Sequence, residues 1–293
     1  MTNPRFLQTA GRWMNKEPPA DIIEPERIIR PTNLENVLVF SGGKEIFVID
    51  RDSSIKEVAS RTDWVRALCS HNGTLYDGGS YNGVFNTLSN KAVASRTSLV
   101  LALCSNNGIL YDGGGYNKIF NTLSNEEVAS RTSLVLALCS HNGILYDGGF
   151  YNKIFNTLSN EEVASRENSI RALCSHNGIL YDGGDYNKIF NTLSNKAVAS
   201  RESSVLALCS HNGILYDGGN YNKISNTLSS KAVASRENSV RALCSHNGIL
   251  YDGGNYNKIF NTLSNKAVAS RKNSVLALCS HLRKYFVEAG VLK

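Results

Sequence analysis

The stretch ALCSHNGILYDGG, residues 137–149, brings together side chains that could do chemistry. Cys139 and His141 are two residues apart, so on a β-strand they share one face. A thiol beside an imidazole could act as a nucleophile or as a pair of metal ligands. Asp147 and a glycine pair follow in the same stretch. The same letters recur three more times along the chain, which raises the question whether they form a site or a building unit.

The repetition extends over most of the chain with a period of 35 residues. The cysteines that mark it are Cys69, Cys104, Cys139, Cys174, Cys209, Cys244 and Cys279. All six histidines occupy one position of the repeat, and Asn106 fills that position in the remaining copy. A fixed period of this length indicates a solenoid, a propeller or another repeat array.

Each unit predicts four short strands, with the sequences VLALCSH, GILYDGG, KIFNTL and AVASR. Asn-Gly between the first two strands is a strong hairpin signal, and the glycine pair and Ser-Asn mark the next turns. No unit has a helical period or a segment long enough for a typical helix. Four strands in roughly 40 residues are typical of a propeller blade.

The string LYDGGxYNKIFNTLSN resembles the second strand, glycine turn and third strand of WD40-like β-propellers, and the resemblance covers about residues 35 to 281. Asn-Thr stands where the Trp-Asp ending would be, and an arginine stands where Gly-His would precede the first strand. The resemblance implies a WD40-like architecture. Kelch repeats share the glycine pair, but their period is nearer 50.

Six complete units run from Arg61 to Ser270. Val37–Ser60 reads as a unit without its first strand, and Ser274–His281 as a first strand alone. We therefore predict an all-β fold: a seven-bladed β-propeller of four-stranded antiparallel blades, closed by the N-terminal strands plus the C-terminal strand. Such closure is typical of the resembled family and removes exposed sheet ends. An open solenoid is the alternative, but it would need polar caps, and the terminal strands here are apolar.

The predicted domains are an N-terminal extended arm at residues 1–35, the propeller at residues 36–281, and a C-terminal tail or short helix at residues 282–293. All five prolines lie within the arm. The 42% hydrophobic and 19% charged content fits a soluble globular protein, and no apolar run approaches the roughly 18 residues of a membrane helix. The net charge of +6 includes no dense Lys/Arg block. We expect a cytoplasmic, monomeric protein that binds neither membranes nor nucleic acid.

The cysteines are best interpreted as small apolar residues packed between blades. An odd number with one per blade is a poor disulfide framework and favours a reducing compartment. A metal site would need Cys and His ligands to converge, whereas identical spokes diverge around a ring. We therefore predict no metal, no cofactor and no catalytic Cys–His pair.

The resemblance implies a structural role for the Asp of each DGG triplet. In that fold it takes the position of a strand hydroxyl, the arginine that of a structural histidine, and the turn tyrosine that of an aspartate. We expect an Arg–Asp–Tyr hydrogen-bond network in each blade, for which neighbouring blades supply Arg131, Asp147, Tyr151 and Arg166, Asp182, Tyr186.

The copies differ in the loop before the first strand, in the turn after the glycine pair, and at one position early in the first strand. In an up-and-down blade these places lie at one end, so they form one face of the disc and the channel mouth. In the resembled family this face usually binds partners. We call it the varied face, and its predicted binding residues are Trp64, Arg66, Leu99, Leu101, Leu134, Leu136, Phe150, Glu167, Arg171, Asp185 and Arg241.

The repetition of every reactive group argues against a single active site. We predict a non-enzymatic scaffold whose varied face binds a protein or peptide. One alternative is a multivalent small-ligand or carbohydrate binder with one pocket per blade, and another is a hydrolase or lyase at the channel mouth around Arg66, Arg171 and Arg241. Drift between copies could also explain the variation, and Trp64, Leu99 and Leu134 could instead cover strand edges or the N-terminal arm.

Overall fold

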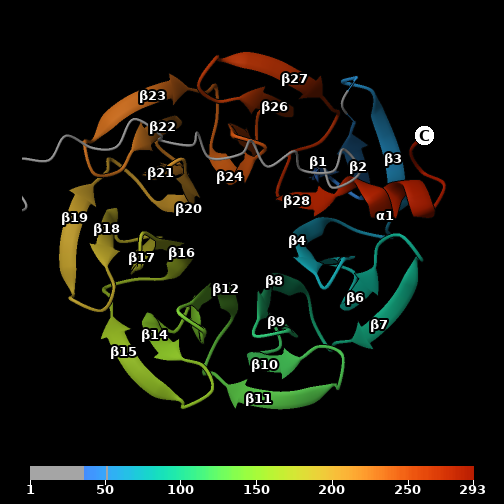
Figure 1. Cartoon of the computed structure of the whole chain (residues 1–293). Helices are drawn as coiled ribbons and strands as arrows, with labels where there is room; N and C mark the ends of the chain where they lie inside the picture. Colours follow the sequence, from blue (N-terminus) through green and yellow to red (C-terminus); the bar gives the residue numbers. More distant parts are fainter. Residues whose placement is uncertain (1–35, 51) are drawn as a thin grey trace, which may run out of the picture. The chain divides into compact units, whose positions relative to one another are not determined.

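A computed structural model describes residues 36–50 and 52–293 of the chain. These residues form seven four-stranded antiparallel sheets around a common axis (Figure 1), with the first strand of each blade innermost and the fourth at the rim. The predicted seven-bladed propeller is therefore confirmed. The N-terminal arm predicted at residues 1–35 lies outside the described residues.

Six blades take their four strands from consecutive chain, in the order inner to outer. The first three are β4 (Val65–His71), β5 (Thr74–Gly79), β6 (Gly83–Asn86) and β7 (Lys91–Ser95); β8 (Val100–Asn106), β9 (Ile109–Gly114), β10 (Lys118–Asn121) and β11 (Glu126–Ser130); β12 (Val135–His141), β13 (Ile144–Gly149), β14 (Lys153–Asn156) and β15 (Glu161–Ser165). The next three are β16 (Ile170–His176), β17 (Ile179–Gly184), β18 (Lys188–Asn191) and β19 (Lys196–Ser200); β20 (Val205–His211), β21 (Ile214–Gly219), β22 (Lys223–Asn226) and β23 (Lys231–Ser235); β24 (Val240–His246), β25 (Ile249–Gly254), β26 (Lys258–Asn261) and β27 (Lys266–Ser270).

The seventh blade joins the two ends of the described chain. Its strands, from the axis outward, are β28 (Leu278–Leu282), β1 (Asn36–Gly42), β2 (Glu45–Ile49) and β3 (Ile55–Ser60). Val39 lies opposite Cys279 in the β1–β28 pair, which confirms the predicted closure. The chain then forms a short helix, α1 (Arg283–Glu288), whose Phe286 is fully buried in the same hydrophobic cluster as Val37.

The hydrophobic core lies between neighbouring blades. Tyr146 and Ile154 of one blade pack against Ile170 and Leu180 of the next. A β-carbon added at Gly148 would lie only 2.7 Å from Cγ2 of Ile170, so the first glycine of the pair allows the sheets to approach closely.

The second glycine of each pair accompanies a β-bulge that sets the channel mouth. Val135 lies opposite Gly149 and Ala137 lies opposite Gly148, so Leu136 is an extra residue in the first strand. A β-carbon on Gly149 would lie 1.9 Å from the carbonyl oxygen of Leu134. Since a bulge changes the direction of the side chain it carries, this backbone feature places the position of Leu136 at the channel mouth in every complete blade.

Candidate functional site

Each of the six complete blades contains a buried arginine–aspartate pair. Arg131 donates from Nε and Nη2 to the two carboxylate oxygens of Asp147, at 2.6 Å each. The hydroxyl of Tyr151 donates to the same carboxylate at 2.5 Å. Arg166, Asp182 and Tyr186 are arranged in the same way in the next blade. The structure thus brings together the residues of both triads.

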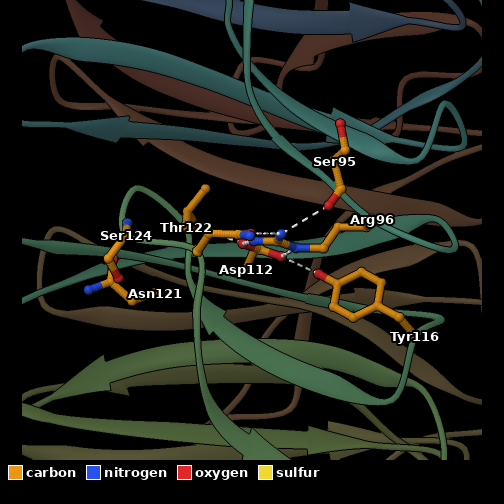
Figure 2. A network of polar contacts seen from close by, with 8 residues as sticks. Ser95, Arg96, Asp112, Tyr116, Asn121, Thr122 and Ser124 are labelled. Atoms are coloured by element: carbon orange, nitrogen blue, oxygen red, sulfur yellow. Dashed lines mark hydrogen bonds and ion pairs between the residues drawn. The ribbon is translucent and has the colours of Figure 1, made fainter.

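The network contains members that sequence reasoning missed. Thr157 Oγ1 donates to Asp147 at 2.8 Å, and Arg131 Nη1 donates to Asn160 Oδ1 at 2.7 Å. The Arg131 guanidinium lies 4.2 Å from the centre of the Phe155 ring. Figure 2 shows the equivalent group around Asp112, where Arg96, Tyr116 and Thr122 converge on one carboxylate. The signal was in the sequence, because NTL follows DGG in all six complete units, and the asparagine two residues after NTL is present in five of them, with Ser230 in its place in the other.

The pKa values of these groups follow from burial and from the shared carboxylate. Burial opposes the charge of Arg131, but the hydrogen bonds and the negative charge of Asp147 raise its pKa. Burial and the charge of Asp147 raise the pKa of Tyr151 far above its usual value. The arginine therefore stays charged and the tyrosine stays a donor, as a structural network requires.

The expectation of this network in every blade is wrong for the seventh. Phe40 lies opposite Leu278 just as Asp147 lies opposite Leu138, so a buried phenylalanine occupies the aspartate position. The Arg271 guanidinium lies 4.2 Å from the centre of the Phe47 ring. Unlike its six counterparts, it has no carboxylate partner in residues 36–50 and 52–293. The seventh blade therefore has the aromatic ring of the network but no carboxylate at the aspartate position.

The histidines form a hydrogen-bonded belt that links all seven blades. His141 Nδ1 contacts Ser175 Oγ of the next blade at 2.8 Å, and Asn142 donates to His141 Nε2, which places the imidazole proton on Nδ1. Asn106, which replaces histidine in one copy, accepts from Ser140 at 2.7 Å. The contact between Ser70 and His281 closes the belt, whose other pairs are His71–Ser105, His176–Ser210, His211–Ser245 and His246–Ser280.

The cysteines lie beside this belt as protonated thiols. Burial raises the pKa of Cys139 to about 11, and burial with the neighbouring Cys139 raises that of Cys104 to about 12. Each thiol contacts the carbonyl of the next serine, as Cys139 does with Ser140 at 3.5 Å. All seven are free, and no group of three metal-ligating side chains gathers within the described part of the chain. A buried neutral thiol is a poor nucleophile.

The predicted channel-mouth residues surround one axial cavity of about 240 Å³. The innermost strands contribute Arg66, Leu101, Leu136, Arg171, Leu206 and Arg241 to its rim, and the segment just before β28 contributes Leu276. Arg66 Nε donates to Ser80 Oγ at 2.8 Å, and Arg171 pairs with Asp185 at 2.8 Å. The Arg171 guanidinium also lies 4.7 Å from the ring centre of Phe150, which comes from the preceding blade.

Arg241 differs from the other two arginines at the rim. Its side chain is exposed, and it has no hydrogen-bond or ion-pair partner among the residues that the structure describes. Although Arg241 is exposed, the protein around the channel mouth partly desolvates its guanidinium and lowers its pKa, and the positive charges of Arg171 and Arg66 lower it further. Three cations therefore line one small cavity, and among the described residues only Arg171 of the three pairs with a carboxylate, that of Asp185.

The loops of the varied face lie together as the topology predicts. The carbonyl of Leu134, before the first strand, accepts from the backbone N–H of Phe150 in the glycine turn at 3.0 Å, and Trp64 and Leu99 accept similar bonds. Phe150 is 40% exposed and Glu167 is exposed, whereas Trp64, Leu99 and Leu134 are half-buried. These three apolar side chains therefore expose only part of their surface on the varied face.

Exposed leucines at the turn between the third and fourth strands were not predicted. Five of them are 51 to 55% exposed: Leu123, Leu158, Leu193, Leu228 and Leu263. The equivalent Leu88 is less exposed, because it packs in the cluster that also contains Val291. This position hardly varies between copies, so the comparison of repeats could not draw attention to it.

No helix in the described residues is long and apolar enough to span a membrane. No family model matches the chain, and no curated protein matches its sequence. Solved structures do match. The crystal structure of the computationally designed Ika8 protein is similar with a TM-score of 0.57 and 16% identity, over 86% of this chain and 95% of that chain. The WD40 β-propeller domain of Doa1 has a TM-score of 0.57 and 11% identity, over 82% and 95% of the two chains. At these identities the likeness concerns the fold.

Proposed function

We propose that this chain, which has a WD40-like β-propeller fold, is a non-catalytic scaffold that binds a protein or peptide on its varied face. The observation that carries the proposal is the charge at the channel mouth. Arg66, Arg171 and Arg241 line one cavity there, and Arg241 forms no hydrogen bond or ion pair within the described chain. Aromatic residues and arginine are the side chains most enriched at protein interfaces, and Phe150 and Trp64 lie at the same face. The other repeated reactive groups are engaged in the fold.

The rim charges favour a partner segment with acidic character. A positive rim attracts such a segment over distance, and the effect weakens as salt screens it. The half-buried Trp64, Leu99 and Leu134 would add apolar contact around it.

A pull-down from the native host tests the proposal. The triple variant Trp64→Ala, Phe150→Ala, Arg241→Ala should lose the partner that the wild type recovers, and recovery should fall as salt rises. The matched control changes exposed leucines on the other turns, Leu123→Ala and Leu158→Ala, and should retain the partner. Equal recovery by the triple variant with unchanged thermal stability would contradict the proposed face.

A multivalent small-ligand binder is the second candidate, because cavities recur beside the networks. Those beside Arg166, Arg131 and Arg236 have volumes of about 380, 340 and 130 Å³, and each is lined by a tyrosine and a phenylalanine. Calorimetry separates the two functions: equivalent pockets predict several sites per chain, and a protein partner predicts one.

A further inference from the structure

The seventh blade contains a larger version of the cavity that recurs beside the networks. The cavity beside Arg271 has a volume of about 800 Å³, whereas the matching one beside Arg166 has about 380 Å³. Tyr186 lines the smaller cavity, but the turn from Gly42 to Glu45 contains no tyrosine. Because no tyrosine ring fills this place in the seventh blade, the space next to the Arg271 guanidinium is larger.

Arg271 keeps the carbonyl of the preceding serine, which all six counterparts contact, and the aromatic ring, which five of them contact, but it lacks their acid. Its Nη1 donates only to the carbonyl of Ser270, at 2.7 Å, and its Nε has no partner in the part of the chain described. The Cζ atom of the Arg271 guanidinium lies 4.2 Å from the centre of the Phe47 ring. Burial lowers the pKa of Arg271, whereas Asp147 raises that of Arg131, yet an arginine remains charged in a protein.

The facing wall carries the opposite charge, and its carboxylates form no ion pair with another residue that the structure describes. In a complete blade, Lys153 and Glu162 form an ion pair at 2.7 Å. Their positions in the seventh blade hold Glu45 and Glu57, because Phe47 lies opposite Glu57 as Phe155 lies opposite Glu162.

Both glutamates line the cavity together with Arg271 and Lys272, and no ion pair joins any of these four within residues 36–50 and 52–293. The cavity therefore has two cations on the β27–β28 connection, two anions on β2 and β3, and apolar surface from Phe47 and Ile55.

We propose that this cavity binds a small zwitterion, a molecule with a carboxylate, an ammonium group and an apolar side chain, as in a free amino acid or a dipeptide. The ligand carboxylate pairs with the Nη atoms of Arg271, and supplies the acid that the other six blades carry themselves. The ammonium group pairs with Glu45 and Glu57. A cavity of this volume lies in the range of small-molecule sites. Arg271 and Glu45 are partly buried and Glu57 and Lys272 are exposed, and partly buried charges such as the first two favour an occupant that neutralises them. The site is separate from the varied face and does not depend on the function proposed for it.

Calorimetry on the full chain tests the proposal with four probes. L-Phenylalanine and the dipeptide Phe-Gly carry both charges, 3-phenylpropionate lacks the ammonium group, and 2-phenylethylamine lacks the carboxylate. At least one zwitterion should bind at one site per chain, and each singly charged probe should bind at least tenfold more weakly. The stronger zwitterion identifies the ligand as amino acid or dipeptide. Failure of both zwitterions, or equal binding of a singly charged probe, would overturn the proposal.

Variants locate the site. Arg271→Gln should weaken zwitterion binding at least tenfold and leave the melting temperature nearly unchanged, because no acid is left unpaired. Lys153→Gln, at the wall of a complete blade, should bind as the wild type does. Phe40→Asp supplies an internal carboxylate and should abolish binding. Should that variant not fold, Glu45→Gln with Glu57→Gln decides: it should weaken the zwitterion but not 3-phenylpropionate. Wild-type affinity in Arg271→Gln would sink the assignment.

Discussion

Arg131 and Asp147 meet edge to edge, with two parallel hydrogen bonds of 2.6 Å between a guanidinium and a carboxylate that are both buried. The arginine lies in the loop before the innermost strand of the blade, and the aspartate lies on the second strand. The pair therefore connects the loop that enters the blade with the sheet itself. Bidentate pairs of this kind are strong and geometrically specific. Six of the seven blades repeat the arrangement.

Asp147→Asn should lower the free energy of unfolding by about 3 to 5 kcal/mol, because it leaves the Arg131 charge buried without a counter-charge. Urea denaturation followed by circular dichroism measures the change. The control is Asp185→Asn, whose pair with Arg171 is partly exposed and should contribute less than about 1 kcal/mol. Equal, small losses in both variants would show that the network does not hold the blade.

The histidine belt should make stability depend on pH. Burial lowers the pKa of His246 and of His281 to about 4 in the folded protein, below the unfolded value of 6.5. The unfolded chain therefore binds more protons between these values, so stability is complete above pH 6.5 and falls as the pH drops toward 4.

Thermal unfolding across this pH range measures the effect of the belt. The double variant His246→Asn, His281→Asn should show a shallower dependence, since Asn106 already fills the position in one blade. An unchanged slope would contradict a titrating belt.

Gly148→Ala should destabilise the fold by about 1 to 3 kcal/mol, because the new methyl group meets Ile170 of the next blade at 2.7 Å. Ile170→Ala alone should cost about 2 to 5 kcal/mol through the cavity it leaves. The double variant should lose less than the sum of the two, because each change relieves the other. Additive losses in a double-mutant cycle would argue against the close contact.

The cysteines should resist alkylation in the folded protein. Burial keeps the thiols protonated at neutral pH, with the pKa of Cys209 raised to about 11. Mass spectrometry after iodoacetamide treatment at pH 7.5 should show little labelling of the native chain and seven adducts after denaturation. Rapid native labelling at Cys139 would instead indicate a reactive site.

The sequence predicted blade number, strand count and closure, because each unit carries its own local signals. Asn142 and Gly143 both have positive φ, 49° and 77°, as the type I′ hairpin predicted by Asn-Gly requires. The acid of each triad could also be identified, because the resemblance to WD40-like propellers implied a structural role for the Asp that recurs 16 residues after an arginine in each complete unit. The histidine belt could not, because His141 bonds to a serine of the next blade, and no property of one unit specifies that partner.

The sequence by itself determined the repeat, its strands and the chemistry offered by each position. Only the tertiary structure decided which residues meet at the seventh blade. Its glycine pair suggests Ser41 as the counterpart of the aspartate, but pairing with β28 from the far end of the chain places Phe40 there. That register depends on closure of the whole ring. This is why the cavity, and the absence of a carboxylate partner for Arg271 among the described residues, could not be predicted from the local pattern.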